Sequence, residues 1–379
     1  MIYLDNSATT KPHPEVLKSF EQVSTSFFAN PSSIHQLGGE TEKLLIKSKQ
    51  QAAMLLKVHE DEIIFTSGGT EGNNIAIKGI ALEHQGRGKH IITTEIEHPS
   101  VYEGCKSLEK LGFEVTFLPV NQDGVVSIED VEKAIRKDTI LISIMHVNNE
   151  IGSIQSIKEI GEIAKKHPKL FFHVDHVQGL GKVPLSLDNS GIDLCTMSGH
   201  KIHGLKGTGL LYCRRGVKLF PLFHGGDQEF AIRSGTENLA GAVSLVKALR
   251  LIKEREEKES GKLLELNHFL RQELKNMEKV VLNTPEESAP HIVNFSIPGL
   301  KPEVMIHTLG KQGIFISTKS ACSSKDLDES RIIKACGYNQ IRTKSALRVS
   351  LSYDNTIEEV KIFLNKLNEA INQLKEVME

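Results

Sequence analysis

Short apolar segments alternate with helical patterns between residues 63 and 213. The apolar segments, which have the pattern of buried strands, lie at 63–65, 90–94, 113–118, 139–147, 170–174, 193–197 and 209–213. Helical patterns separate most of them, at 70–84, 99–111, 127–137 and 157–167. Strands that alternate with helices in this way are typical of βαβ units, so the region predicts an α/β fold with a mostly parallel central sheet.

The pattern changes after about residue 241. We expect a charged helix at 242–259, a second helix at 262–277, a strand at 291–297, a helix at 301–312 and a terminal helix from about 356. This order predicts a smaller α+β domain. We therefore expect two domains.

The composition excludes several classes of protein. The 379 residues include 46 basic and 48 acidic side chains, and a net charge of −2 does not favour direct binding to nucleic acid. No apolar run approaches the roughly 18 residues of a membrane span, and the N-terminus lacks the pattern of a secretory signal. The five cysteines form no CxxC pair. We therefore expect a cytoplasmic protein that contacts neither nucleic acid nor membrane directly.

A glycine-rich turn follows the first strand of the predicted sheet. Residues 67–74 have the sequence SGGTEGNN and lie between a strand and a helix. Glycines let the backbone approach a ligand, and a helix N-terminus offers free N–H groups to an anion. No Gly-Lys-Ser/Thr follows, so this is not a Walker A loop. The alternative is an ordinary turn with Thr70 as the helix N-cap.

Two further strand ends carry polar side chains. His173 and Asp175 share one face of a strand, which leaves open a metal site with His176, a buried Asp–His pair, or an acid that faces a heterocyclic cofactor. Lys201 follows the next strand, beside Ser198 and His200. A lysine in this company suits a Schiff base with a phosphorylated aldehyde, and the alternative is a solvated surface charge.

Two residues near the C-terminus are also candidates. Cys322 lies among small polar residues at 317–324, so it is either an exposed nucleophile or a tolerated surface cysteine. The other four cysteines fall in strand or helix patterns. Arg348 lies inside the apolar run 346–350. A buried arginine needs an anion, which is either a substrate carboxylate or the partner of an internal salt bridge.

One cofactor accounts for these features together. A lysine that forms a Schiff base and an acid that faces a pyridinium nitrogen are the mark of pyridoxal phosphate (PLP) proteins. Over essentially its whole length, the chain resembles the cysteine desulfurases of the class V aminotransferase family. The motifs that carry the resemblance are YLDNSATT (3–10), NPSSIH (30–35), SGGTEGNN (67–74), EHPS (97–100), HVNNEIG (146–152), HVDHVQGLGK (173–182), SGHKIHGLKGTG (198–209), RSGTEN (233–238), SACSS (320–324) and ALRVS (346–350).

The resemblance implies the PLP-dependent transferase fold of type I. Residues 12–255 would form the large PLP-binding domain. Residues 1–11 and 256–379 would form the small domain, which would carry the loop with the catalytic cysteine. Lys201 would hold PLP and move protons, helped by His98, which would stack on the ring. Asn149 and Arg348 would orient the substrate carboxylate.

The resemblance also implies a set of cofactor-binding residues. Asp175 would pair with the ring nitrogen and Gln178 with the ring hydroxyl. Thr236 would reach the phosphate bound by the other subunit, so a homodimer is part of the prediction. The cofactor-binding residues would be Lys201, Thr70, Asp175, Gln178, Ser198, His200 and Thr236.

The implied reaction converts L-cysteine to L-alanine and leaves the sulfur as a persulfide on Cys322. An acceptor protein would then take the sulfur, either an iron–sulfur scaffold or an enzyme of tRNA thiolation. The alternatives are a selenocysteine lyase and another PLP-dependent lyase or aminotransferase of this fold. No metal is implied. His176 stands where many relatives have a small residue, and we expect its side chain to point away from the ring.

Overall fold

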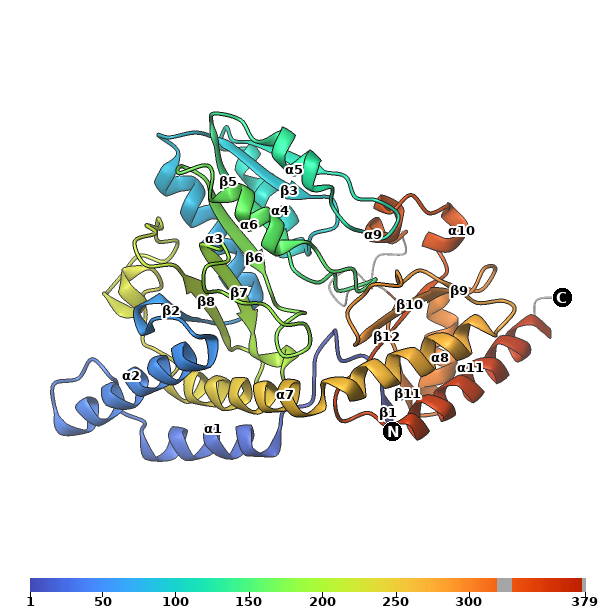
Figure 1. Cartoon of the computed structure of the whole chain (residues 1–379). Coiled ribbons are helices and arrows are strands. Elements are labelled where there is room, and N and C mark those ends of the chain that lie inside the picture. Colours follow the sequence, from blue (N-terminus) through green and yellow to red (C-terminus); the bar gives the residue numbers. More distant parts are fainter. Residues whose placement is uncertain (319–328, 377–379) are drawn as a thin grey trace.

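The computed structural model describes residues 1–318 and 329–376 of the chain. The larger part contains a seven-stranded sheet, and the smaller part contains a three-stranded and a two-stranded sheet (Figure 1). Within the described residues, no helix combines the length and the apolar character that crossing a membrane requires.

The large sheet has the strand order β2-β8-β7-β6-β5-β3-β4. Its strands are β2 Ile63–Thr66, β3 His90–Thr94, β4 Glu114–Leu118, β5 Thr139–Met145, β6 Phe171–Asp175, β7 Leu194–Ser198 and β8 Gly209–Cys213. β8 runs antiparallel to both of its neighbours, whereas the pairs from β7 to β4 are parallel. The expected mostly parallel sheet is confirmed, and the strand bounds differ from those expected by no more than two residues.

Helices cover both faces of this sheet (Figure 1). Successive side chains of a strand point to opposite faces, so on β3 Ile91 packs in the core beneath α3 and α4, while Ile92 packs in the core beneath α6 and α7. The helices of the larger part before α7 are α1 Pro14–Ser26, α2 Gln36–Leu56, α3 Gly69–His84, α4 Pro99–Glu109, α5 Ile128–Ala134 and α6 Ile157–Ala164.

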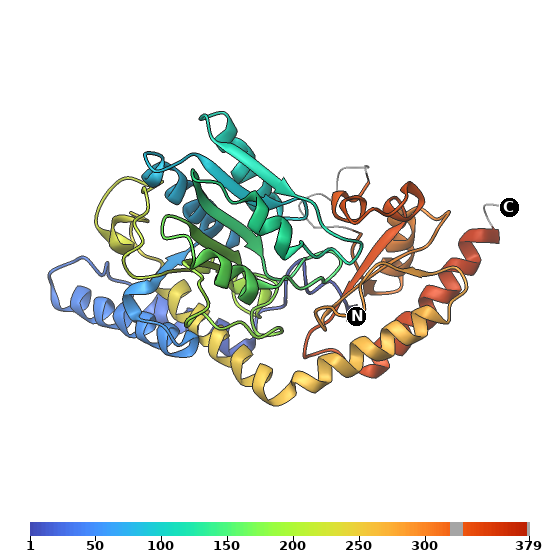
Figure 2. The ribbon, with the colours of Figure 1, turned by 45° about the horizontal axis from the view of Figure 1, so that its top comes forward.

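A single long helix, α7 (Leu239–Lys275), joins the two parts. Figure 2 shows it running beneath the large sheet and bending on toward the small one. The expected pair of helices at 242–259 and 262–277 is therefore wrong. The only breaker between them is Gly261, and a glycine inside a helix costs only about 1 kcal/mol, which the buried leucines on both sides of it offset.

The smaller part is built around an antiparallel sheet of order β12-β10-β9. Its strands and helices are β9 Val281–Leu282, β10 Ile292–Ser296, α8 Pro302–Lys311, α9 Arg331–Ala335, α10 Gln340–Thr343, β12 Ala346–Ser350 and α11 Ile357–Glu376. The N-terminal strand β1 (Ile2–Tyr3) pairs with β11 (Ile314–Phe315) of this part, and the chain then crosses to the large sheet. The predicted domain boundary after residue 255 falls inside α7, and the domain limits stay a prediction.

Candidate active site

A cavity opens where the strands of the large sheet end. In open α/β sheets, ligands bind beyond the carboxyl ends of the strands. Its walls are formed by Ser7, Ala8, Gly69, Thr70, Asn73, His98, Ser100, Met145, Asn149, Asp175, Val177, Gln178, Ser198, His200, Lys201 and Arg348. Every predicted site residue except Thr236 and Cys322 is among them.

The carboxylate of Asp175, the last residue of β6, is held in a fixed orientation. Its Oδ2 accepts a hydrogen bond from Asn73 Nδ2 at 2.8 Å, and its Oδ1 accepts one from the backbone N–H of Val177 at 3.0 Å. The side chain is buried and lines the cavity. A buried carboxylate in this setting favours a cationic or N–H group on whatever the cavity binds.

A polar chain connects Asp175 to His98. Asn73 Nδ2 also donates to Ser100 Oγ at 2.9 Å, and Ser100 Oγ lies 2.7 Å from His98 Nδ1. Sequence reasoning assigned no role to Asn73 or Ser100. The sequence feature that could have indicated Asn73 is its position one helical turn after Thr70, which places both residues on the same face of α3.

His98 is also the N-cap of α4. Its Nδ1 accepts the backbone N–H of Ser100 at 3.2 Å, so the neutral ring carries its proton on Nε2. Burial lowers the pKa of the imidazole. The charge of Asp175 raises this pKa, and the charge of Lys201 lowers it. The neutral form therefore dominates at pH 7 and presents one N–H to the cavity.

Lys201 ends the short turn η2 (Gly199–Lys201) that follows β7. Its Nζ donates to the backbone oxygens of Ser7 at 2.5 Å and Ala8 at 2.8 Å. Side-chain patterns cannot reveal such contacts, because backbone carbonyls are present at every residue. The only sequence feature that could have indicated these partners of Lys201 is the YLDNSATT motif, which contains Ser7 and Ala8.

The N-terminus of α3 forms another wall of the cavity. The N-cap is Gly68, whose φ of +147° suits glycine, so the interpretation of Thr70 as N-cap is wrong. Thr70 lies in the first turn and faces the cavity with Ser198 and His200. Burial, followed by the charge of Lys201, lowers the pKa of His200 to about 4. Helix N–H groups and hydroxyls of this kind favour an anion.

Four buried oxygens of residues in the cavity wall have no hydrogen-bond partner among the described residues: Ser7 Oγ, Asn73 Oδ1, Gln178 Oε1 and Ser198 Oγ. The amide nitrogen of Gln178 donates to Ser7 O at 3.0 Å. Native proteins rarely leave buried polar groups unpaired, so these oxygens point to a polar ligand in the cavity.

Arg348, in β12, is 1% exposed and has a carboxylate partner within the chain. Its Nη2 lies 2.9 Å from Asp5 Oδ1, and its Nη1 donates to the backbone oxygen of Asn149 at 2.7 Å. Its Nε has no partner within the described part of the chain. Burial raises the pKa of Asp5, and the charge of Arg348 opposes this shift. Arg348 therefore forms an internal salt bridge and also lines the cavity.

Two predicted site residues are not part of the cavity as described. Thr236 is exposed and lies outside the cavity wall. Cys322 falls outside the described residues. The four other cysteines, Cys105, Cys195, Cys213 and Cys336, are buried. Burial raises the pKa of each of their thiols, so none of the four supplies a thiolate at neutral pH.

The histidines of the HVDH motif, His173 and His176, do not line the cavity. His173 is fully buried, with Nδ1 2.8 Å from Ser143 Oγ and Nε2 2.9 Å from Thr196 Oγ1. His176 pairs through its Nδ1 with His146 Nδ1 at 2.9 Å and is absent from the cavity wall. The described residues contain no cluster of three or more His, Cys, Asp or Glu that could hold a metal ion.

These buried imidazoles predict a loss of stability in acid. Burial lowers the pKa of His173 to about 3 and that of His146 to about 4, whereas an unfolded histidine titrates near 6.5. Below pH 6.5 the unfolded chain binds more protons, so the free energy of unfolding falls as the pH falls toward 4. Each imidazole contributes about 1.4 kcal/mol per pH unit in this window and nothing above it.

Urea unfolding between pH 5 and pH 7 measures this slope. We expect His173→Gln to reduce the slope below pH 6 by about one proton, or about 1.4 kcal/mol per pH unit. The matched control is His224→Gln, because His224 is exposed. An unchanged slope in His173→Gln would contradict a neutral buried imidazole.

Comparisons with known proteins agree with this geometry. The sequence profile described as aminotransferase class-V matches residues 2–363. The chain is 43% identical over 378 residues to "Cysteine desulfurase IscS" of Dictyoglomus turgidum, an alignment that covers 99% of this chain and 96% of the relative.

Two solved structures are similar over most of their length. A "NifS-like protein" superposes with a TM-score of 0.92 and 36% identity, covering 98% of this chain and 99% of the other. A structure described as "SspA in complex with cysteine" superposes with a TM-score of 0.81 and 32% identity, covering 93% of this chain and 99% of the other.

Proposed function

Because the chain belongs to the class-V aminotransferase family, in its group of NifS/IscS-like cysteine desulfurases, we propose that the cavity binds PLP and converts L-cysteine to L-alanine, with Cys322 taking the sulfur as a persulfide. The observation that carries the proposal is the meeting of Asp175, Lys201 and Arg348 in one cavity. An acid, an amine and a carboxylate-binding cation are the protein groups that amino-acid chemistry on PLP requires.

The residues of the cavity fit PLP. The fixed carboxylate of Asp175 suits a pyridinium N–H, and the unpartnered Gln178 Oε1 suits a ring hydroxyl. The unpartnered Ser198 Oγ, with Thr70 at the N-terminus of α3, suits a phosphate. When bound, PLP supplies an electron sink that stabilises negative charge at the substrate α-carbon.

The chain's own residues supply binding and proton transfer. Arg348 keeps Nη1 and Nη2 on Asn149 and Asp5, and offers its Nε to the substrate carboxylate. Lys201 Nζ takes the proton from the substrate α-carbon after leaving the carbonyls of the N-terminal segment. His98 holds a proton on Nε2 at the cavity wall.

The sulfur step is a transfer to Cys322. The Cys322 thiolate attacks the substrate sulfur, and an S–S bond forms as the bond from sulfur to the substrate β-carbon breaks. L-cysteine and the protein thiol thus give L-alanine and a protein persulfide, with no external oxidant. The persulfide sulfur then passes to an acceptor protein in the cytoplasm, either an iron–sulfur scaffold or an enzyme of tRNA thiolation.

The visible spectrum of the purified protein tests this proposal. We expect a yellow PLP band that changes when L-cysteine is added, and alanine that forms in step with persulfide on Cys322. A protein that stays colourless with added PLP contradicts the proposal. A yellow protein that ignores L-cysteine favours the alternatives, a selenocysteine lyase or another PLP-dependent lyase or aminotransferase, and selenocysteine is then the first substrate to add.

A homodimer is part of the proposal. Phe28 is 75% exposed, Ile34 is fully exposed and Phe230 is 50% exposed. Phe230 lines a surface hollow together with Glu237, the neighbour of Thr236. Ile46, which is 45% exposed, lines the same hollow. Exposed apolar side chains around one hollow are typical of protein interfaces. A second copy on this surface would bring the exposed Thr236 of one subunit toward the phosphate bound by the other.

Mixed dimers test the placement of Thr236 across the interface. Thr236→Val should weaken PLP binding about tenfold, because a hydrogen bond to a charged group is lost. In a dimer of one Thr236→Val chain and one Lys201→Ala chain, one site combines the unaltered Lys201 of the first chain with the unaltered Thr236 of the second. That site should bind PLP with normal affinity. Weak binding in the mixed dimer, or a monomer in sedimentation, would contradict this arrangement.

A further inference from the structure

The hydroxyl of Thr10 holds the backbone on both sides of Lys201. Thr10 Oγ1 accepts the backbone N–H of His203 at 2.7 Å and donates to the backbone oxygen of His200 at 2.9 Å. The backbone N–H of Thr10 donates to the same oxygen at 2.9 Å. The side chain is 4% exposed. One buried hydroxyl therefore connects the residue before Lys201 to the residue two positions after it.

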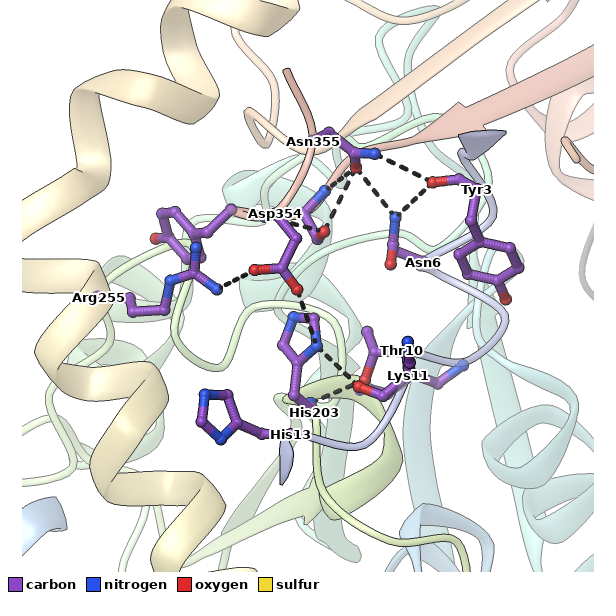
Figure 3. A network of polar contacts seen from close by, with 12 residues as sticks. Tyr3, Asn6, Thr10, Lys11, His13, His203, Arg255, Asp354 and Asn355 are labelled. Carbon is purple, nitrogen blue, oxygen red and sulfur yellow. Dashed lines mark hydrogen bonds and ion pairs between the residues drawn. The ribbon is translucent and has the colours of Figure 1, made fainter. Parts of the chain in front are cut away.

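His203 completes this connection. Its ring Nδ1 donates to the backbone oxygen of Lys11 at 3.0 Å, and its backbone oxygen accepts the N–H of His13 at 2.9 Å. Figure 3 shows His203 between Thr10 and Lys11 on one side and Asp354 on the other. Its φ of +60° lies in the left-handed region, which a residue other than glycine adopts only when the surroundings hold it there.

The same ring nitrogen of His203 also lies near a carboxylate of the smaller part of the chain. Asp354 Oδ2 lies 3.7 Å from His203 Nδ1, and Asp354 Oδ1 accepts from Arg255 on α7 at 2.6 Å (Figure 3). Ser7, on the same N-terminal segment as Thr10, donates its backbone N–H to Ser350 Oγ at 2.8 Å. The segment from Ser7 to His13 is thus fixed at several points along its length.

The same segment contacts the amine of Lys201. Ser7 and Ala8 accept hydrogen bonds from Lys201 Nζ, and Thr10 follows two residues later. We propose that Thr10 is a positioning residue for Lys201: its hydroxyl clamps the turn that carries the lysine and thereby sets where Nζ lies in the cavity. This inference rests on the proposed function, in which Lys201 acts on PLP and on the substrate.

The pair Thr10→Val and Thr10→Ser tests the inference in the PLP-loaded protein. Valine has nearly the shape of threonine but leaves the buried N–H of His203 without its acceptor, whereas serine keeps the hydroxyl. We expect Thr10→Val to release PLP about tenfold faster and to lower kcat about tenfold, the size expected for a buried donor left unpaired. The KM for L-cysteine should stay within about twofold, because Arg348 is untouched. Thr10→Ser should restore both values.

A purely structural role gives a different result. Thr10→Val would then lower the melting temperature while PLP release and kcat stay as in the unchanged protein, and that outcome overturns the inference. If Thr10→Val does not fold, His203→Asn replaces it, since asparagine tolerates a positive φ but cannot make the ring contact to Lys11. It should speed PLP release about fivefold, the effect of one lost hydrogen bond, and normal release would overturn the inference.

The control for these variants is His13→Asn. The His13 ring caps α1, and only its backbone N–H contacts His203, so PLP release should not change. Failure of the proposed function is recognised separately, because the unchanged protein would then bind no PLP.

Discussion

Replacing Lys201 with alanine is expected to lower the rate of alanine formation from L-cysteine by at least about 1,000-fold. A positioned general base contributes about 10²- to 10⁴-fold, and in the proposed function the amine of Lys201 also attaches the cofactor. The two carbonyls that hold Nζ, of Ser7 and Ala8, cannot take over a proton. The measurement is alanine release from the PLP-loaded variant, with the visible spectrum recorded alongside.

The control lysine lies five positions further along the chain. Lys206 is exposed and does not line the cavity, so Lys206→Ala should leave alanine formation within about twofold of normal, as for an ordinary surface substitution. A small primary amine added to Lys201→Ala should restore part of the rate, because the alanine leaves room in the cavity. Alanine formation by Lys201→Ala within tenfold of normal would contradict the role of Lys201.

The main elements of the site follow from the order of strands. Asp175 ends β6 and Lys201 follows β7, and these strands are parallel neighbours, so their carboxyl ends meet at one edge. An apolar run that stops at a polar residue therefore indicates a strand. It also indicates that the polar side chain lies at the carboxyl-end edge of the sheet. The same reasoning places Thr70 after β2 and His98 after β3.

Contacts made by the backbone could not be predicted in this way. The partners of Lys201 Nζ are carbonyls, and the role of Thr10 depends on the N–H of a residue 193 positions away. Residue types and spacing report side-chain chemistry, whereas these contacts depend on how the N-terminal segment crosses between the two parts. The salt bridge of Asp5 with Arg348 has the same origin, because its two members lie 343 positions apart in the chain.

Removal of the Cys322 thiol is the second substitution from which we expect a large effect. Cys322→Ala should form no persulfide and should lose sulfur transfer to an acceptor, because no other group is proposed to take the substrate sulfur. The visible PLP band should stay as in the unchanged protein, since none of the residues proposed to hold PLP is altered. Radiolabelled cysteine, followed by gel analysis of protein-bound sulfur, measures the persulfide.

The other cysteines provide a second measurement and a control for this experiment. The four described thiols are buried and burial raises the pKa of each, so a thiol reagent should modify the folded protein once, at Cys322, and should modify Cys322→Ala hardly at all. Cys336→Ser serves as the control, with persulfide formation preserved, because Cys336 does not line the cavity. Normal transfer of sulfur by Cys322→Ala would require another acceptor on the chain, and the buried thiols are poor candidates because their thiolates are scarce at neutral pH.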